Sequence, residues 1–171
     1  MNERIHLRAS GFTLIEVMVV MILAGVVTLG LVGFYLNSQS TWIDGSSQAL
    51  AQRDATTILE SIASRADSAA SVQLTAVPPD TVLEFYRVGS ALPYYGFRWG
   101  QGAGEDSLLH QGPGSCNPDQ GPVVPSVVER FSVTLDANPK VPVLHVASLR
   151  VRSATGQVVE VSSSFALRNA P

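Results

Sequence analysis

The sequence predicts an α+β protein in which one long N-terminal helix packs on an antiparallel β-sheet. Two observations carry this prediction. Residues 17–36 form a block of twenty residues without a charge, and a helical pattern continues after it. Beyond Pro78-Pro79, short runs rich in β-forming residues replace the helical pattern. Runs of helix and strand that are separated along a chain in this way are typical of α+β folds.

Composition excludes several classes of protein. Of the 171 residues, 46% are hydrophobic and 15% are charged, against about 25% charged residues in an average soluble domain. The net charge of −3 argues against nucleic-acid binding, which needs a basic patch. A chain this apolar is not disordered, and one cysteine, Cys116, cannot form an internal disulfide framework. The mean hydropathy of +0.21 therefore averages a concentrated apolar block with an ordinary remainder.

The apolar block has the length of a transmembrane helix. About twenty apolar residues cross a hydrocarbon core of about 30 Å. Glycines at positions 25, 30 and 33 would weaken a soluble helix but are common in membrane helices, and Tyr35 and Trp42 stand where an interfacial aromatic belt is expected. The alternative is a buried core helix of a soluble protein.

The eleven residues before the block form a short basic leader. Arg4 and Arg8 outweigh Glu3, and a positive flank of this kind stays in the cytoplasm. In a secretory signal peptide, a small-residue cleavage site follows a shorter apolar stretch. Here Ser10 and Gly11 precede the apolar block, so the order of parts does not fit ordinary secretion.

The segment Gly11-Phe12-Thr13-Leu14-Ile15-Glu16-Val17 resembles the prepilin signature of type IV pilins and type II secretion pseudopilins. The resemblance rests on the basic leader, the glycine, the aromatic residue, the glutamate and the apolar run, and it covers about the first forty residues. It implies that a membrane prepilin peptidase cleaves after Gly11 on the cytoplasmic side and that Phe12 is N-methylated. Cleavage would leave 160 of the 171 residues.

Glu16 is the one carboxylate in the apolar region from residue 12 to residue 36. An acidic residue at the centre of a membrane helix costs about 2.5–3.5 kcal/mol, and such residues usually have a functional partner. The resemblance implies that Glu16 meets the N-terminal amine of a neighbouring subunit during assembly. The alternative is a carboxylate that merely reaches the lipid headgroups.

Helical periodicity continues to about residue 70 as an amphipathic pattern, with residues 45–47 as a candidate soft point. The residues expected on the buried stripe are Ile43, Leu50, Ile58, Ile62, Ala66 and Ala69. The predicted organisation is a leader (1–11), a transmembrane or filament-core helix (12–36), an amphipathic helix (37–70) and a β-rich globular domain (71–171).

The globular domain is expected to contain strands at 82–88, 94–99, 127–135, 143–152 and 157–167. From 127 to 135, the residues at odd positions and those at even positions are expected on opposite faces, as in a half-buried strand. Residues 153–156 look like a hairpin turn, and the glycines and prolines between residues 100 and 125 predict irregular structure. Residues 165–169, and 94–99 with 108–110, also resemble PilW-type minor pilins and pseudopilin J. The chain lacks the cysteine pair and the proline in the apolar helix that are found in abundant major pilins, so it does not resemble a major subunit.

Candidate chemistry is sparse. A metal site needs three or four converging ligands, and the histidines at positions 6, 110 and 145 are scattered, with a surface or cross-strand role expected for His145. Calcium could bind if Asp80, Glu105, Asp106 and Asp119 converged, although their spacing does not match a calcium loop. Neither the hydrolase elbow nor the dinucleotide glycine motif is present in residues 100–116. Cys116 is expected to be a free thiol or to pair between molecules.

The leading interpretation is a non-enzymatic minor pilin or pseudopilin without a cofactor. Its expected partners are the prepilin peptidase, other minor pilins or pseudopilins, the major filament subunit and inner-membrane lipid, with no nucleic acid. It would cross the inner membrane once, with its N-terminus cytoplasmic and its globular domain periplasmic, before joining a pilus or pseudopilus. The alternatives are a membrane-anchored periplasmic binding domain that does not polymerise and a tethered enzyme.

Overall fold

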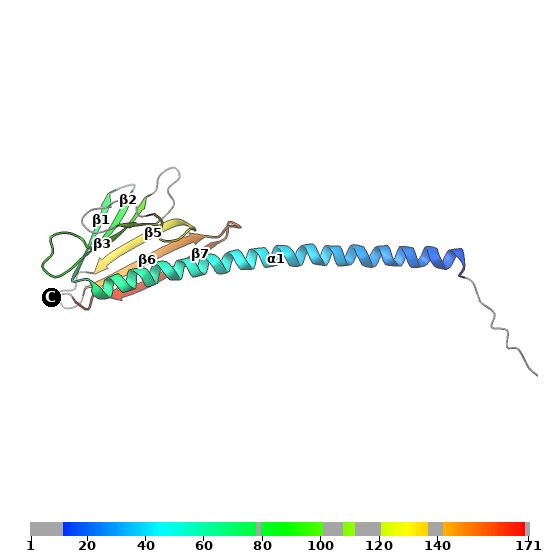
Figure 1. Cartoon of the computed structure of the whole chain (residues 1–171), viewed down its shortest axis with the longest axis horizontal. Coiled ribbons are helices and arrows are strands. Elements are labelled where there is room, and N and C mark those ends of the chain that lie inside the picture. Colours follow the sequence, from blue (N-terminus) through cyan, green and yellow to red (C-terminus); the bar gives the residue numbers. More distant parts are fainter. Residues whose placement is uncertain (1–11, 78–79, 101–107, 112–120, 137–141, 170–171) are drawn as a thin grey trace, which may run out of the picture. The chain divides into compact units, whose positions relative to one another are not determined.

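The computed structural model describes residues 12–77, 80–100, 108–111, 121–136 and 142–169. One helix, α1 (Leu14–Ser68), precedes all the strands, which confirms the α+β class (Figure 1). The chain divides within α1 into a first unit that ends at Ile43 and a second unit that begins at Asp44. The strands are β1 (Ser71–Val77), β2 (Asp80–Tyr86), β3 (Tyr95–Gly100), β4 (Leu108–Gln111), β5 (Val127–Asp136), β6 (Val143–Arg152) and β7 (Val158–Ala166).

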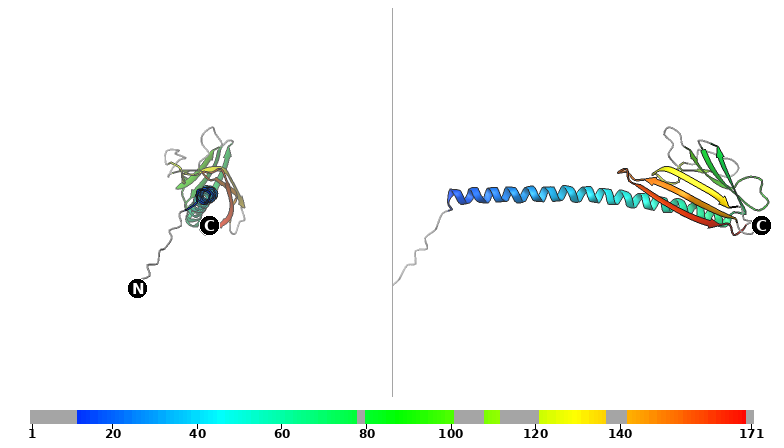
Figure 2. Two further views of the ribbon diagram at one scale, coloured as in Figure 1. Left: turned by 90° about the vertical axis from the view of Figure 1, so that its right-hand side faces the viewer. Right: turned by 180° about the vertical axis from the view of Figure 1, so that it is seen from behind.

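The second unit contains two antiparallel sheets where one was predicted. Strands β1 to β4 pair in sequence order in the first sheet, and β5, β6 and β7 pair in the second. Figure 2 shows β5, β6 and β7 beside one another in yellow, orange and red. Each strand pairs with its neighbour along the chain, so both sheets are meanders built from consecutive antiparallel connections.

The second half of α1 buries a narrow stripe of small and β-branched side chains. Its members recur every three or four residues, as expected for one helix face. They are Ser47, Ala51, Ala55, Ile58, Ile62 and Ala66. Alanine at three of these positions allows the helix backbone to approach the sheet closely.

Two residues of the predicted stripe lie outside it. Leu50 and Ile43 expose 56% and 54% of their surface. Leu50 and Ile58 are eight residues apart, and eight residues turn a helix about 80° past two full turns. Leu50 therefore points away from the sheet that Ile58 contacts.

The helix passes through residues 45–47 without interruption, so the candidate soft point is helical. Ser47 is buried there, and its hydroxyl bonds to the Asp44 carbonyl oxygen at 2.9 Å and to Thr155 Oγ1 at 2.7 Å. The second contact fixes this turn of α1 to the β6–β7 hairpin.

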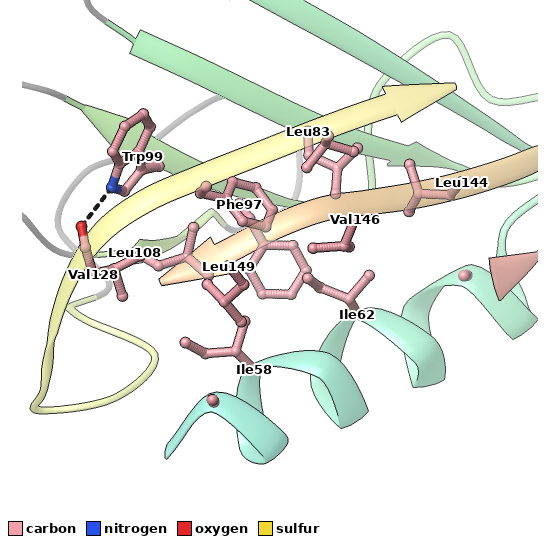
Figure 3. Packing of buried hydrophobic residues seen from close by; sticks show 14 of the residues in the cluster. Ile58, Ile62, Leu83, Phe97, Trp99, Leu108, Val128, Leu144, Val146 and Leu149 are labelled. Carbon is pink, nitrogen blue, oxygen red and sulfur yellow. Dashed lines mark hydrogen bonds between the residues drawn. The ribbon is translucent and has the colours of Figure 1, made fainter. Parts of the chain in front are cut away.

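One hydrophobic core joins the helix to both sheets (Figure 3). Ile58 and Ile62 of α1 pack with residues of both sheets, including Phe97 of β3 and Leu149 of β6, all of them fully buried. The Trp99 indole donates a hydrogen bond to the Val128 carbonyl oxygen at 2.8 Å, which ties β3 to β5.

The strand predictions need three corrections. Strand β1 was missed, and β4 lies inside the segment predicted to be irregular, with Leu108 fully buried. In β5, strict alternation fails because register shifts follow Val128 and Ser132. Consequently Val128, Phe131 and Val133 are buried, whereas Val127 is exposed.

The predicted β6–β7 hairpin is confirmed. Its turn is closed by a hydrogen bond from the Ser153 amide to the Gln157 carbonyl oxygen at 2.7 Å. Gly156 has φ +85°, a conformation that glycine adopts without steric cost.

Candidate functional site: the N-terminal helix

The first unit presents apolar surface that the described residues leave exposed. Within the described residues, α1 is the helix that is long and apolar enough to cross a membrane, and none of its most apolar 18-residue window is buried. Leu29 and Phe34 each expose 74% of their surface. Apolar surface favours burial by about 25 cal/mol per Å², so this face requires lipid or other helices around it.

The start of α1 has a cap that the sequence analysis missed. The Glu16 amide donates to the Thr13 carbonyl oxygen at 3.1 Å and lies 3.4 Å from Thr13 Oγ1, and the Val17 amide also donates to the Thr13 carbonyl oxygen at 3.3 Å. Thr13-Leu14-Ile15-Glu16 has the Thr-x-x-Glu spacing of a capping box, which was visible in the sequence. Thr13 therefore sets the first turn of the helix.

Glu16 is placed in that first turn, with its side chain exposed. The N-terminal end of a helix carries a partial positive charge that stabilises a carboxylate. Within the described part of the chain, no cationic side chain pairs with Glu16. The carboxylate thus lies at the helix start and is accessible to another molecule.

Of the two predicted processing residues, Phe12 lies next to this cap. Phe12 precedes the helix and exposes 80% of its surface, whereas Gly11 lies outside the described residues. If the chain is cleaved after Gly11, the new amine on Phe12 stands four residues before Glu16. Amine and carboxylate would then lie at the same end of the helix.

The glycines of the first unit have no packing partner among the residues that the structure describes. A methyl group added at Gly25, Gly30 or Gly33 would meet no atom within 4 Å. Small residues on a membrane helix allow a neighbouring helix to approach closely, as in many packed transmembrane bundles. Tyr35 and Trp42, the predicted interfacial aromatics, expose 60% and 78% of their surface.

The last turns of α1 are held by two tyrosines that precede and begin β3. Tyr94 donates its hydroxyl to the Arg65 carbonyl oxygen at 2.8 Å, and the Arg65 guanidinium lies 4.0 Å from the centre of the Tyr95 ring. Burial raises the pKa of Tyr94 and of Tyr95, and the positive charge of Arg65 offsets part of this rise. These contacts fix the helix end to the first sheet.

Other predicted chemistry is placed as follows. His145 Nδ1 lies 2.7 Å from Ser164 Oγ on the neighbouring strand, so the expected cross-strand role is confirmed. Among the residues that the structure describes, no group of three or more histidine, cysteine or acidic residues is arranged to hold a metal ion. The candidates that lie outside the described residues are His6, Glu105, Asp106, Cys116 and Asp119.

Comparison with known families identifies the N-terminal segment. The family model for the prokaryotic N-terminal methylation motif matches residues 7–32. No curated protein and no solved structure matches the chain. The match includes Gly11, Phe12, Thr13 and Glu16 and ends within the exposed apolar part of α1. The chain therefore carries the prokaryotic N-terminal methylation motif, the signal of type IV pilins and pseudopilins.

Proposed function

We propose that this chain is a minor pilin-like subunit of a type IV pilus or type II secretion pseudopilus. The observation that carries the proposal is the methylation motif at the start of an apolar helix that is exposed among the described residues. Proteins with this motif are structural subunits rather than enzymes. The chain would be inserted in the inner membrane, cleaved after Gly11 by a prepilin peptidase and methylated on Phe12.

In the filament, α1 supplies the contacts that hold subunits together. Its exposed apolar surface would leave lipid and pack among the helices of the major subunit and of sibling minor subunits. Contacts that join one copy to the next without closing a ring generate a helical fibre. The second unit would project from the filament core and face partner subunits.

Glu16 would set the position of each subunit. Its carboxylate, exposed in the first turn of α1, would pair with the Phe12 amine of a neighbouring subunit. A buried ion pair contributes little net stability, but an unpaired buried charge is strongly unfavourable. The pair would therefore select one register between neighbouring helices.

Helix capping by Thr13 and subunit pairing by Glu16 can be separated experimentally. Glu16→Gln keeps a residue type that serves in a capping box but removes the charge, whereas Thr13→Ala removes the cap and keeps the charge. Each variant is expressed with the filament machinery, and its content in sheared fibres and in membranes is measured by immunoblot. Glu16→Gln should stay in the membrane and be lost from fibres, while Thr13→Ala should enter both.

Normal incorporation of Glu16→Gln into fibres would refute the pairing role. The alternative function, a membrane-anchored binding domain that does not polymerise, predicts that neither the wild-type chain nor any variant enters fibres.

A further inference from the structure

The second unit contains an open cavity of about 550 Å³ between the first sheet and β5–β6. Leu74, Thr81 and Trp99 of the first sheet line one side. Arg130, Ser132 and Arg150 of the second sheet contribute polar groups to the other. Small-molecule sites typically have volumes of about 300–1,000 Å³, so this cavity has the size of such a site. Its lining is more polar than usual, which favours a charged ligand.

Two arginines lie side by side in the lining of the cavity. Arg130 of β5 and Arg150 of β6 are directly opposite in the strand register, so both side chains lie on the same face of the sheet. Like charges in such a pair destabilise a sheet. The pairing has no evident folding benefit and concentrates positive charge at one point of the cavity wall.

Neighbouring carboxylates neutralise this charge incompletely. Glu129, which also lines the cavity, forms an ion pair with Arg152. Glu160 accepts a hydrogen bond from Ser148 at 2.6 Å and reaches Arg150 Nε at only 3.8 Å.

Both arginines retain unused hydrogen-bonding capacity. The Arg150 Nε atom is buried beside Glu160 without a hydrogen bond, whereas 41% of the Arg150 side chain is exposed, so a ligand would contact its terminal nitrogens. Among the described residues, Arg130 has no ion pair. Guanidinium groups bind carboxylates and phosphates through paired N–H donors, and unused donors at a cavity wall are suited to such an anion.

The geometry points to a binding site for a small organic anion, with its carboxylate or phosphate group on Arg130 and Arg150. The apolar part of the ligand would contact Leu74 and the indole of Trp99. This site does not depend on filament assembly, because its residues belong to the second unit and the methylation motif belongs to the first.

The test uses the full chain in non-ionic detergent and isothermal titration calorimetry. The probes are inorganic phosphate, phenyl phosphate and benzoate, with benzyl alcohol as the uncharged control. Phenyl phosphate should bind more tightly than inorganic phosphate because it also fills the apolar side of the cavity, and benzyl alcohol should not bind. If benzoate binds as tightly as phenyl phosphate, the natural ligand class includes carboxylates as well as phosphates.

Variants assign the binding to the arginine pair. Arg130→Gln and Arg150→Gln should each weaken phenyl phosphate binding about tenfold or more, since each loses a charge-assisted hydrogen bond. Arg150→Lys should bind between the wild type and Arg150→Gln because it keeps the charge without the paired donors. Arg168→Gln is the matched control, since Arg168 is an exposed arginine outside the cavity with a weak ion pair to Asp67.

Thermal unfolding provides a second readout that does not require tight binding. Without ligand, Arg130→Gln should unfold at the same temperature as the wild type or higher, because it relieves the like-charge pair. Phenyl phosphate should raise the unfolding temperature of the wild type and of Arg168→Gln, but not that of Arg130→Gln.

Equal affinity of the wild type and both glutamine variants would overturn the proposal. It would also be overturned if none of the anionic probes showed saturable binding at millimolar concentration.

Discussion

Replacing Ile58 by alanine tests the packing of α1 on the sheets. The Ile58 side chain projects from α1 into the core shared with the two sheets and is fully buried. The change removes three carbon atoms, each worth about 0.8 kcal/mol of transfer free energy, and leaves a cavity that adds to the loss. Alanine's higher helix propensity returns a few tenths of a kcal/mol. The expected loss in the free energy of unfolding is about 3 kcal/mol.

Leu50→Ala is the matched control on the same helix. Leu50 already exposes 56% of its surface, so its truncation should change the free energy of unfolding by less than about 1 kcal/mol. Both variants are unfolded with urea in non-ionic detergent in a Trp42→Phe background, so that buried Trp99 reports on the second unit. Equal destabilisation by the two truncations would refute the assignment of the buried face of α1.

Three further predictions concern the second unit. Gly156→Ala should lower the free energy of unfolding by about 1 kcal/mol in urea titrations because it forces a side chain into a positive-φ turn. Trp99→Phe should lower the free energy of unfolding through lost indole packing. It should lower it by about a further 1–3 kcal/mol because the buried Val128 carbonyl oxygen loses its hydrogen-bond donor. A urea titration followed by circular dichroism measures the total loss. The folded state raises the pKa of Tyr94 and Tyr95 above the ordinary value of 10.0, so it favours their protonated forms. Their contribution to stability should be complete below pH 10 and should decline as the pH rises through the higher folded-state pKa. The urea midpoint measured across the alkaline range should therefore fall as the pH rises.

The sequence was sufficient for the features that depend on local pattern. The uncharged block and the absence of proline before residue 78 predicted a helix that the structure shows from Leu14 to Ser68. Strand β6 follows the predicted bounds, and the turn at Gly156 follows from its residue types.

Features that depend on tertiary contacts could not be predicted in this way. Strand β4 has four residues and lies in a sequence rich in glycine and proline that predicted a loop. Only its pairing with β3 identifies it as a strand. The irregularities in β5 place Val128 and Phe131 on the same buried side, which period-two counting cannot anticipate. Arg130 and Arg150 are twenty positions apart in the sequence, and only the strand register brings them together.

The N-terminal motif could be recognised from the sequence because it is local. The family model confirms the motif that contains Glu16 and Phe12, the roles of these residues stay predictions, and the same segment contains Thr13, which caps the helix start. What the local sequence does not determine is the partner of the Glu16 carboxylate, because that partner would belong to another subunit.

The most direct test of the proposed function is the intact mass of the chain after co-expression with an active prepilin peptidase. Processing predicts the loss of residues 1–11 and the gain of one methyl group, with fragmentation placing that methyl group on the amine of Phe12. Gly11→Leu, which should block cleavage, provides the unprocessed reference. A wild-type chain that keeps its first eleven residues, while a known prepilin in the same cells is cleaved, would contradict the assignment of this protein to a pilus or pseudopilus.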